Sequence, residues 1–428
     1  MNKVMLTVLP GFKIDHTQLP EQRVEEGAAV KQIALLGSDL PGLRPKLLCE
    51  QGERVTRGQA VFHDRANPDV VFVSPVSGVV ESITLGPRRS LSALVIRSDS
   101  DQPEPDPVVT AMSSAEEVRE TLLAKGFWPA FLTRPYGRIP APDAVPDAIF
   151  VTVTPDNPHA PDPRVVLDEG QHDAFAAGLK AIALLTSGPV HVCQTPGTNV
   201  AAGCGDRIRG SFFSDAPSSG LSGTHIHRLH PVDKGRSVWS IGYQDVAAIG
   251  RLIETGVHDF SRLVTFTGAR AVQPRLIRTV AGANLQGLIR EETLPGNHGS
   301  PLCVLSGSVT NGRQASWLGR YHQQITLLDN TQPRRMVSKG GLLGLFRQAS
   351  SRPAPVIPTA ALEQALPFDV PVVPFLRALS VGDAETASRM GCLEMVEEDV
   401  AAVSLACTSG ADYGRMLRHV LDELAEDA

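Results

Sequence analysis

Apolar residues in the first hundred positions come in short runs that alternate with polar residues and are separated by glycine turns. Residues 70–73 and 76–83 are two such runs, and their period of two predicts short β-strands. Gly52 and Gly58 lie between apolar segments, where a tight turn favours a residue without a Cβ atom. The pattern predicts a small β-sandwich near the start of the chain.

The spacing within residues 48–83 resembles the half-motif of biotinyl/lipoyl carrier domains. A true carrier presents a lysine at an exposed hairpin, because the cofactor is attached through an amide to the ε-amine. Here the corresponding hairpin is residues 65–69, Arg-Ala-Asn-Pro-Asp, and no lysine occurs from 47 to 124. We therefore predict a carrier-like barrel-sandwich domain over residues 1–100 that lacks the modified lysine and serves in architecture or docking.

A linker and a helix follow this domain. Residues 98–107, SDSDQPEPDP, combine acidic residues with prolines, a composition that interrupts regular structure. A helix is predicted over residues 114–125, because a capping box at 113–117 opens it and Gly126 closes it.

The apolar pattern then becomes that of an α/β domain. Residues 148–153 and 190–193 are compact apolar runs typical of buried strands. Residues 170–186, between them, carry apolar side chains at helical spacing. A strand, a helix and a strand in this order predict a βαβ crossover, so we expect a Rossmann-like α/β domain over residues 110–258.

The rest of the chain divides into two further predicted domains. Strands at 263–268 and 275–282, followed by a short helix, predict a β-grasp-like unit of the soluble-ligand-binding type over residues 259–330. Residues 331–428 are predicted to be helical, with Met416, Val420 and Leu424 on one apolar stripe of the final helix.

Composition narrows the possible partners and the compartment. The formal charge of −6 argues against a nucleic acid partner, since phosphate binding requires a concentrated basic surface. Six dispersed cysteines without a CxxC pair fit a reducing compartment and exclude a linear iron–sulfur motif. No uncharged apolar run reaches the roughly 18 residues of a membrane span, and the N-terminus lacks a signal-peptide pattern. We expect a cytoplasmic chain.

Motifs for nucleotides and nucleophiles are absent from the sequence. The turn at 154–158, Thr-Pro-Asp-Asn-Pro, lacks the glycines that let a backbone approach a pyrophosphate. The chain also lacks a P-loop, a GxSxG elbow and an HExxH zinc motif. Neither a conventionally bound dinucleotide nor a covalent catalyst is predicted.

His225, His227 and His230 form an HxHxxH cluster in SGTHIHRLHPV. If this segment were a strand, His225 and His227 would face the same side and could chelate a metal. However, no nearby cysteine or carboxylate cluster completes a ligand set. The three residues are weak metal candidates, and hydrogen-bonded loop histidines are the favoured interpretation.

Aromatic and cationic residues gather in the segment 125–138. Trp128, Phe131 and Tyr136 are close to Arg134 in the sequence, and prolines restrict the backbone of this stretch. Apolar rings with a cationic donor suit a flat, carbonyl-bearing ligand such as a quinone. The same composition also fits a loop that its rings anchor at a domain seam, and this is the simpler interpretation.

Several segments, in register from end to end, are similar to the A subunit of the bacterial Na+-translocating NADH:quinone oxidoreductase. Each is weak alone, but together they are specific and cover nearly the whole chain. They are residues 35–45, 52–80, 127–140, 222–232, 239–250, 274–285, 305–309, 318–328 and 369–401.

The resemblance implies a peripheral subunit on the cytoplasmic face of the inner membrane, without a redox centre of its own and not catalytic alone. Sister subunits of such a complex hold the NADH site, the flavins and the iron–sulfur centres. The chain is also similar to the C subunit of Rnf complexes and to the flavin- and NADH-binding subunit of complex I. Those relatives carry a glycine-rich loop where this chain has residues 127–140, and Trp128, Phe131 and Arg134 would fill the space of a flavin phosphate.

We therefore expect a non-redox scaffold that docks on membrane subunits and has a ubiquinone-binding role. The expected quinone contacts are Trp128, Phe131, Arg134 and Tyr136, with Leu35, Leu36 and Arg44 in a second wall. One alternative is a stand-alone ligand-binding protein that uses the β-grasp unit, with Arg275 and Arg278 as donors. Another is an NADH-oxidising enzyme with an atypical site.

Overall fold

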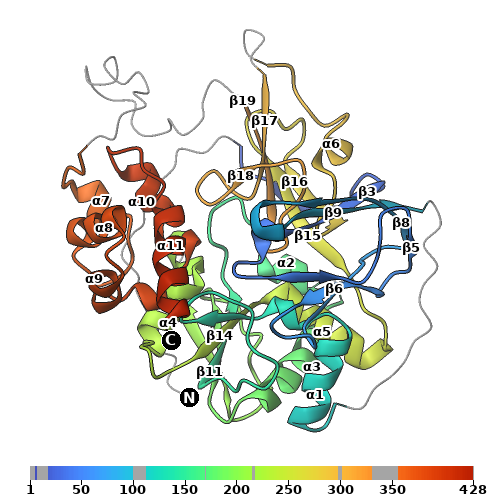
Figure 1. The fold of residues 1–428 in the computed structure, drawn as a ribbon, viewed down its shortest axis with the longest axis horizontal. Helices are drawn as coiled ribbons and strands as arrows, with labels where there is room; N and C mark the ends of the chain where they lie inside the picture. The colour runs from blue at the N-terminus through green and yellow to red at the C-terminus, as the bar shows by residue number, and fades with distance from the viewer. Residues whose placement is uncertain are drawn as a thin grey trace.

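Four sheets and a helical tail make up the computed structural model of the chain (Figure 1). It describes residues 5–6, 18–99, 112–168, 170–214, 217–296, 301–329 and 355–427. Most of the predicted linker at 98–107 lies outside the described residues, as do residues 331–354 of the predicted fourth domain.

Two small antiparallel sheets form the first module, as the alternating pattern predicts. Stacking of Phe62 on Phe72, with ring centroids 4.5 Å apart, fills part of the core that the sheets share. The lysine-free hairpin at 65–69 connects the strands β6 and β7. The strand orders are β3 (Gln32–Leu36), β9 (Leu91–Ser98), β8 (Gly78–Leu85), β5 (Arg54–Val55) in one sheet, and β4 (Pro45–Leu47), β6 (Ala60–Asp64), β7 (Val71–Val73) in the other, with short 3-10 turns η1 (Gly37–Asp39) and η2 (Pro87–Arg89).

The first residues of the chain depart from the expected 1–100 module. Strand β1 (Met5–Leu6) pairs in parallel with β13 of the α/β sheet, and β2 (Glu21–Glu26) pairs in parallel with β16 of the third sheet. The N-terminal segment thus supplies edge strands to two other units. A period-two pattern indicates a strand but does not specify its partner, so the sequence could not show this.

A six-stranded sheet with helices on both faces forms the second unit. Alternate residues of β11 face opposite cores: Ile149 and Val151 pack with α3 and α5, and Phe150 packs on the side of α4. The predicted βαβ segment is confirmed, since β11 and β12 pair in parallel around α3. The sheet order is β1, β13 (Ile208–Phe213), β12 (Val190–Gln194), β11 (Ala148–Val153), β14 (Val238–Gly242) and the antiparallel edge strand β10 (Leu132–Arg134).

The helices of this unit are α1 to α5 with three short 3-10 turns. They are α1 (Ala115–Ala124), η3 (Trp128–Ala130), α2 (Pro163–Asp168), α3 (His172–Ile182), η4 (Ala183–Leu185), η5 (Pro217–Gly220), α4 (Ser222–Leu229) and α5 (Tyr243–Thr255). The predicted start of α1 is confirmed, because Ser114 and Glu117 form a capping box. Gly126 ends it with φ of 70°, and a Cβ there would lie 2.8 Å from Val73 of the first module.

The third sheet and the tail complete the molecule. The sheet order is β18 (Arg313–Gln314), β17 (Leu302–Ser306), β19 (Gln324–Asp329), β15 (Ser261–Thr267), β16 (Arg275–Val280) and β2, with the short helix α6 (Leu285–Leu288) against its core. The tail consists of α7 (Ala360–Gln364), α8 (Val372–Val381), α9 (Ala384–Arg389), η8 (Cys392–Glu394), η9 (Glu397–Val400), α10 (Ala401–Ala406) and α11 (Tyr413–Glu426). In the predicted stripe of α11, Val420 and Leu424 are buried, and Met416 is only partly so.

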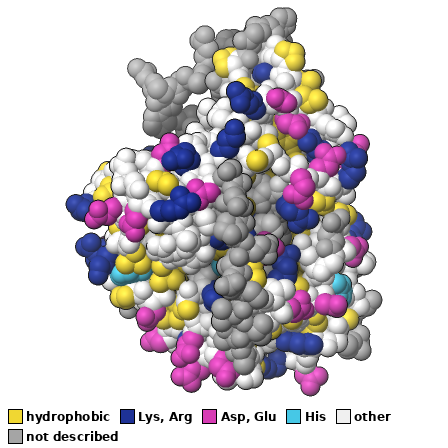
Figure 2. All heavy atoms as spheres, turned by 90° about the vertical axis from the view of Figure 1, so that its right-hand side faces the viewer, with side chains coloured by type: hydrophobic (Ala, Val, Ile, Leu, Met, Phe, Trp, Pro, Cys, Tyr) yellow, Lys and Arg dark blue, Asp and Glu magenta, His cyan; other side chains and the backbone are white. Residues whose placement is uncertain are grey.

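Charged side chains are interspersed on the face that Figure 2 shows, with basic and acidic groups side by side over the described residues. This mixed distribution on that face is unlike the single-sign surface that phosphate binding requires. Among the residues that the structure describes, no helix combines the length and the apolar character needed to cross a bilayer.

Candidate functional site

A cleft of about 820 Å³ lies where all four units of the chain meet. Its walls come from the loops after β11 and β14, from the loop 307–314 of the third sheet, from the turn after β3, and from the tail residues 396–418. Because the walls belong to separate units, the cleft has the position at which multidomain proteins most often bind small molecules.

The position of the cleft follows from the topology of the α/β sheet. The chain leaves β11 toward β12 and β13 on one side and later returns to β14 on the other side of β11. The carboxyl ends of β11 and β14, where loops diverge, both open into the cleft. In open α/β sheets, this switch point is where ligands bind.

The loop after β11 connects two walls of the cleft. Asn311 of the third unit donates from Nδ2 to Asp156 Oδ2 at 3.0 Å. Gly220 lies so close that a Cβ atom there would be 2.3 Å from the Cα of Asp156. Burial raises the pKa of Asp156. The turn at 154–158, which lacks nucleotide-binding glycines, thus connects the α/β unit to the third unit.

Three arginines of the cleft are paired with carboxylates, so much of the wall charge is neutralised. The pairs are Arg262 with Asp245, Arg313 with Asp39, and Arg418 with Glu397 at 2.7 Å. Because three of the five arginines that line the cleft are engaged with carboxylates, the cleft favours a ligand of low net charge over a polyanion.

A carboxyl pair lies beside the tail wall, next to a buried arginine. Ser222 Oγ lies 3.3 Å from Glu398 Oε1 and 3.0 Å from Arg134 Nη2, and Asp399 Oδ2 lies 3.8 Å from the same nitrogen. Burial raises the pKa of both Glu398 and Asp399 above the ordinary carboxyl range. Arg134 opposes that rise, so the protonation of Glu398 and that of Asp399 depend on each other and on the arginine.

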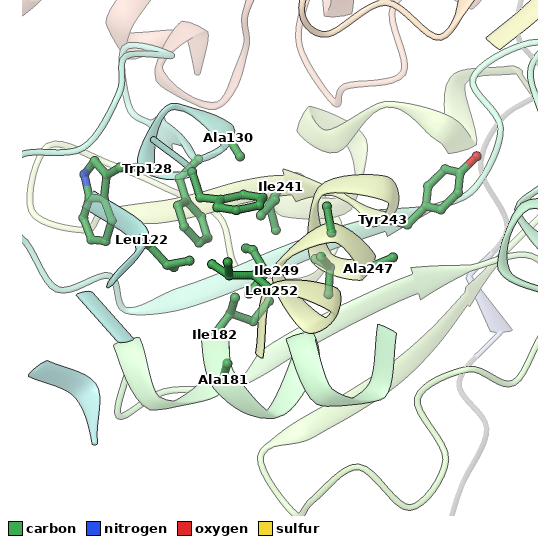
Figure 3. Packing of buried hydrophobic residues seen from close by; sticks show 14 of the residues in the cluster. Leu122, Trp128, Ala130, Ala181, Ile182, Ile241, Tyr243, Ala247, Ile249 and Leu252 are labelled. Atoms are coloured by element: carbon green, nitrogen blue, oxygen red, sulfur yellow. The ribbon is translucent and has the colours of Figure 1, made fainter. Parts of the chain in front are cut away.

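Three of the four aromatic residues of the segment 125–138, Phe127, Trp128 and Phe131, lie inside the core. Trp128 and Phe131 are 0% exposed and pack on Trp239, with Trp128 edge-on at 5.3 Å between ring centroids. Trp128 Nε1 donates to the carbonyl of Pro140 at 2.9 Å. In Figure 3 the indole of Trp128 lies at the edge of the drawn cluster, near Leu122. From this segment the residues Ala130, Leu132 and Gly137 line the cleft.

The other expected quinone contacts lie close to the cleft but are not among the residues that line it. Arg134, 1% exposed, is held by Ser222, Asp399 and the carbonyl of Glu394. Tyr136 packs on the tail, and its carbonyl accepts from Arg418 Nη1 at 2.7 Å. Leu35 and Leu36 are partly buried in β3 and Arg44 is exposed; the cleft wall of this segment is instead formed by residues 38, 39 and 41. Direct quinone contact by any of the seven stays a prediction.

Residues 222–229 form the helix α4, which is neither the favoured loop nor the strand that chelation by His225 and His227 would require. Residues two apart on a helix point to different sides, so His225 and His227 separate. His225 contacts the carbonyl of Ser219 at 2.6 Å, whereas His227 Nδ1 contacts Glu394 at 2.6 Å. The described residues contain no group of three such side chains, His230 included, that could hold a metal.

The contact between His227 and Glu394 predicts that the docking of the tail depends on pH. The carboxylate of Glu394 raises the pKa of His227 above its ordinary value of 6.5. A raised pKa in the folded state stabilises the protein fully below pH 6.5, and this stabilisation is lost as the pH rises through the folded-state pKa. Glu394 also accepts from the backbone N–H of Val232 at 2.9 Å, so it fixes the same junction twice.

We expect the His227→Gln variant to be about 1 to 2 kcal/mol less stable than the wild type at pH 5.5. The difference shrinks as the pH rises to 9, because the wild-type histidine is then neutral. Urea unfolding across this pH range measures it, with the exposed His419→Gln as the control. A deficit that is constant with pH would contradict the charged pair.

Sequence inspection missed the residues that close the cleft. Asp156, Asn311 and Tyr243 come from three different segments, and no local motif unites them. The signal that could have found two of them is position: Asp156 follows β11 and Tyr243 follows β14, at the carboxyl ends of adjacent parallel strands.

Four units around one cleft, placed at the switch point of an α/β sheet without a glycine-rich nucleotide loop, define a multidomain α/β protein with a barrel-sandwich module. Three family descriptions match in order: the NqrA N-terminal barrel-sandwich hybrid domain over residues 6–99, the NqrA second alpha/beta domain over 113–258 and the NQRA C-terminal domain over 263–316. The chain belongs to the NqrA family, the A subunits of the Na(+)-translocating NADH-quinone reductase. The predicted barrel-sandwich architecture and family resemblance are thereby confirmed.

Full-length relatives carry the name of this family. Those of Neisseria gonorrhoeae strain NCCP11945 and Cellvibrio japonicus strain Ueda107 are 37% and 36% identical over 451 aligned residues, 99% of this chain and 100% of each relative. The relative of Pasteurella multocida strain Pm70 is 34% identical over 450 residues. Among solved structures, an NAD+-reducing NiFe-hydrogenase matches 52% of this chain and 48% of its own chain with 12% identity and a TM-score of 0.37.

Proposed function

We propose that this chain acts as the A subunit of a Na+-translocating NADH:quinone reductase, in a peripheral position and without catalysing electron transfer alone. The observation that carries this is identity above one third with such subunits over 99% of the chain. The proposed position is the cytoplasmic face of the inner membrane, docked on membrane subunits of the complex.

We infer that the second unit is Rossmann-like and the third is a β-grasp of the soluble-ligand-binding type. A mostly parallel sheet covered by helices on both faces supports the first assignment, and strands packed on the short helix α6 support the second. The cleft-facing turn after β11 in the second unit, residues 154–158, contains no glycine, which supports the proposal that flavins and iron–sulfur centres belong to partner subunits.

We propose that the cleft receives the quinone of the complex. Its low net charge, its apolar segment of Ala130, Leu132 and Ile241, and its place at the switch point support a neutral ring as ligand. Trp128, Phe131 and Arg134 would then support the wall from behind. The second expected wall, which included Arg44, would be formed by the adjacent turn at 38–41.

The ligand-binding alternative that used the third unit has weaker support. Arg275 is bound to Glu25 and Glu292, and Arg278 lies 3.0 Å from Glu26. These contacts occupy guanidinium donors that would have to bind the ligand if the third unit were the binding site.

Affinity purification of the tagged chain from detergent-solubilised membranes of its host tests the proposal. Recovery of flavin-bearing membrane subunits with Na+-stimulated NADH:quinone reductase activity is the expected result. Recovery of the chain alone, colourless and inactive, would overturn the assignment to the complex.

A further inference from the structure

The first turn of α5 opens into the cleft without a side chain to cap it. Gly242, the N-cap residue, offers no side-chain hydrogen bond, and residues 242–245 all line the cleft. Gln244 cannot serve as the cap, because its amide is bound on both sides to Leu263, at 2.8 and 2.9 Å. The N–H groups of this turn therefore carry the partial positive charge of an uncapped helix start.

Tyr243 adds a second, independent donor at the same place. Its side chain is only 3% exposed and lines the cleft, yet its hydroxyl has no hydrogen-bond partner among the described residues. Figure 3 shows the ring of Tyr243 directed away from the cluster around Ile249, with its oxygen at the far end. A buried hydroxyl without a partner is costly unless something binds it.

The electrostatics of the subsite select the class of ligand. Burial raises the pKa of Tyr243. The Gln244 side chain opposes this rise and the charges of Asp162 and Asp156 add to it, so the hydroxyl stays a proton donor. The same carboxyl groups, together with Asp245 in the first turn, oppose an incoming anion. A neutral carbonyl oxygen accepts hydrogen bonds without adding charge.

We propose that the Tyr243 hydroxyl and the uncapped first turn of α5 form a binding subsite for one carbonyl oxygen of a neutral ring, which in this cleft is the quinone head group. The inference rests on the proposed quinone-binding function and names the residues that would orient the ring. Tyr243 is a binding residue here, with no part in electron transfer.

The Tyr243→Phe variant tests the subsite, because it removes only the oxygen. Binding of a ubiquinone with a short isoprenoid chain to the full chain is measured by isothermal titration calorimetry. The expected loss of affinity is about tenfold, the effect of one hydrogen bond of roughly 1.4 kcal/mol. The thermal stability of the unliganded variant should equal or exceed that of the wild type, because the lost hydroxyl has no protein partner.

Tyr321→Phe is the matched control. Tyr321 also lines the cleft, but its hydroxyl donates to the carbonyl of Pro129 at 2.8 Å. This variant should lose stability and keep quinone affinity within about twofold of the wild type, a margin of roughly 0.4 kcal/mol. Equal loss of affinity in both variants would overturn the subsite, since it would show a general disturbance of the cleft.

The outcomes separate the inference from the function on which it rests. If the wild type binds the quinone and Tyr243→Phe binds it equally well, the subsite is wrong and the quinone cleft stands. If the wild type binds no quinone, both are wrong. Binding of inorganic phosphate that the Tyr243→Phe variant loses would overturn the neutral-ligand assignment.

Discussion

Replacing Gly250 by alanine is expected to lower the free energy of unfolding by at least about 3 kcal/mol, the upper range for added volume in a packed core. A Cβ atom on Gly250 would lie 1.6 Å from the carbonyl oxygen of Ala174 on α3. Backbone cannot yield as a flexible side chain does, so α3 and α5 would have to move apart. Urea unfolding followed by circular dichroism measures the loss.

A matched control and a reciprocal site sharpen this test. Gly287 lies in α6 in open space, where a Cβ would meet nothing within 4 Å, so Gly287→Ala should leave stability unchanged or raise it slightly. A Cβ atom on Gly178 of α3 would lie 2.0 Å from the carbonyl oxygen of Val246, so Gly178→Ala should be destabilising too. A double variant that loses less than the sum would show that both glycines serve one helix contact. A loss below about 1 kcal/mol in Gly250→Ala would contradict this contact.

The same contact positions the proposed ligand subsite. Helix α5 begins at Tyr243 beside the cleft and passes Gly250 about two turns later. Moving α5 away from α3 therefore displaces the hydroxyl and the first-turn N–H groups together. The contact between α3 and α5, which lies outside the cleft, therefore sets the position of the Tyr243 hydroxyl within it.

Elements whose determinants are local could be predicted from the sequence. The strands β11 and β12 and the helix α1 follow from short-range apolar period and from the capping box of Ser114 and Glu117. The barrel-sandwich module was visible for the same reason, since its turns and strands follow one another at short range along the chain.

Features that depend on distant contacts could not be predicted in this way. The helix at His225 was interpreted as a loop, because eight residues of mixed polarity show no clear period. The partners of β1 and β2, which are β13 and β16, lie in distant parts of the sequence. The aromatic segment at Trp128 was correctly seen as unusual, but composition alone does not distinguish a ligand wall from a core that supports one.

Replacing Arg134 by methionine is expected to lower the free energy of unfolding by about 3 to 5 kcal/mol, the cost of leaving one partner of a buried ion pair alone. Arg134 and Asp399 are 1% and 0% exposed. Without the guanidinium, Asp399 and its neighbour Glu398 remain buried without their cation, and the tail loses its bond from Arg134 Nε to the carbonyl of Glu394.

The pH dependence of this loss identifies its cause. Burial already raises the pKa of Asp399, and removing Arg134 raises it further, because the arginine lowers it. A carboxyl whose folded-state pKa is raised binds more protons when folded, so stability falls as the pH rises. The deficit of Arg134→Met should therefore be larger at pH 8 than at pH 5.5, and Arg134→Met/Asp399→Asn should recover part of it. A deficit independent of pH would contradict the ion-pair account.

Arg54→Ala is the control. Arg54 is 69% exposed in its ion pair with Asp99, so this substitution should lower the free energy of unfolding by less than about 1 kcal/mol. This comparison decides how quinone experiments on the aromatic segment are interpreted. Loss of quinone binding in Arg134→Met would not show that Arg134 touches the ring, because the tail wall at Glu398 would move with it. If quinone affinity falls in Arg134→Met but is restored in the double variant with Asp399→Asn, then Arg134 acts by positioning the wall. Loss that persists after stability is recovered would mean that the guanidinium itself binds the ligand.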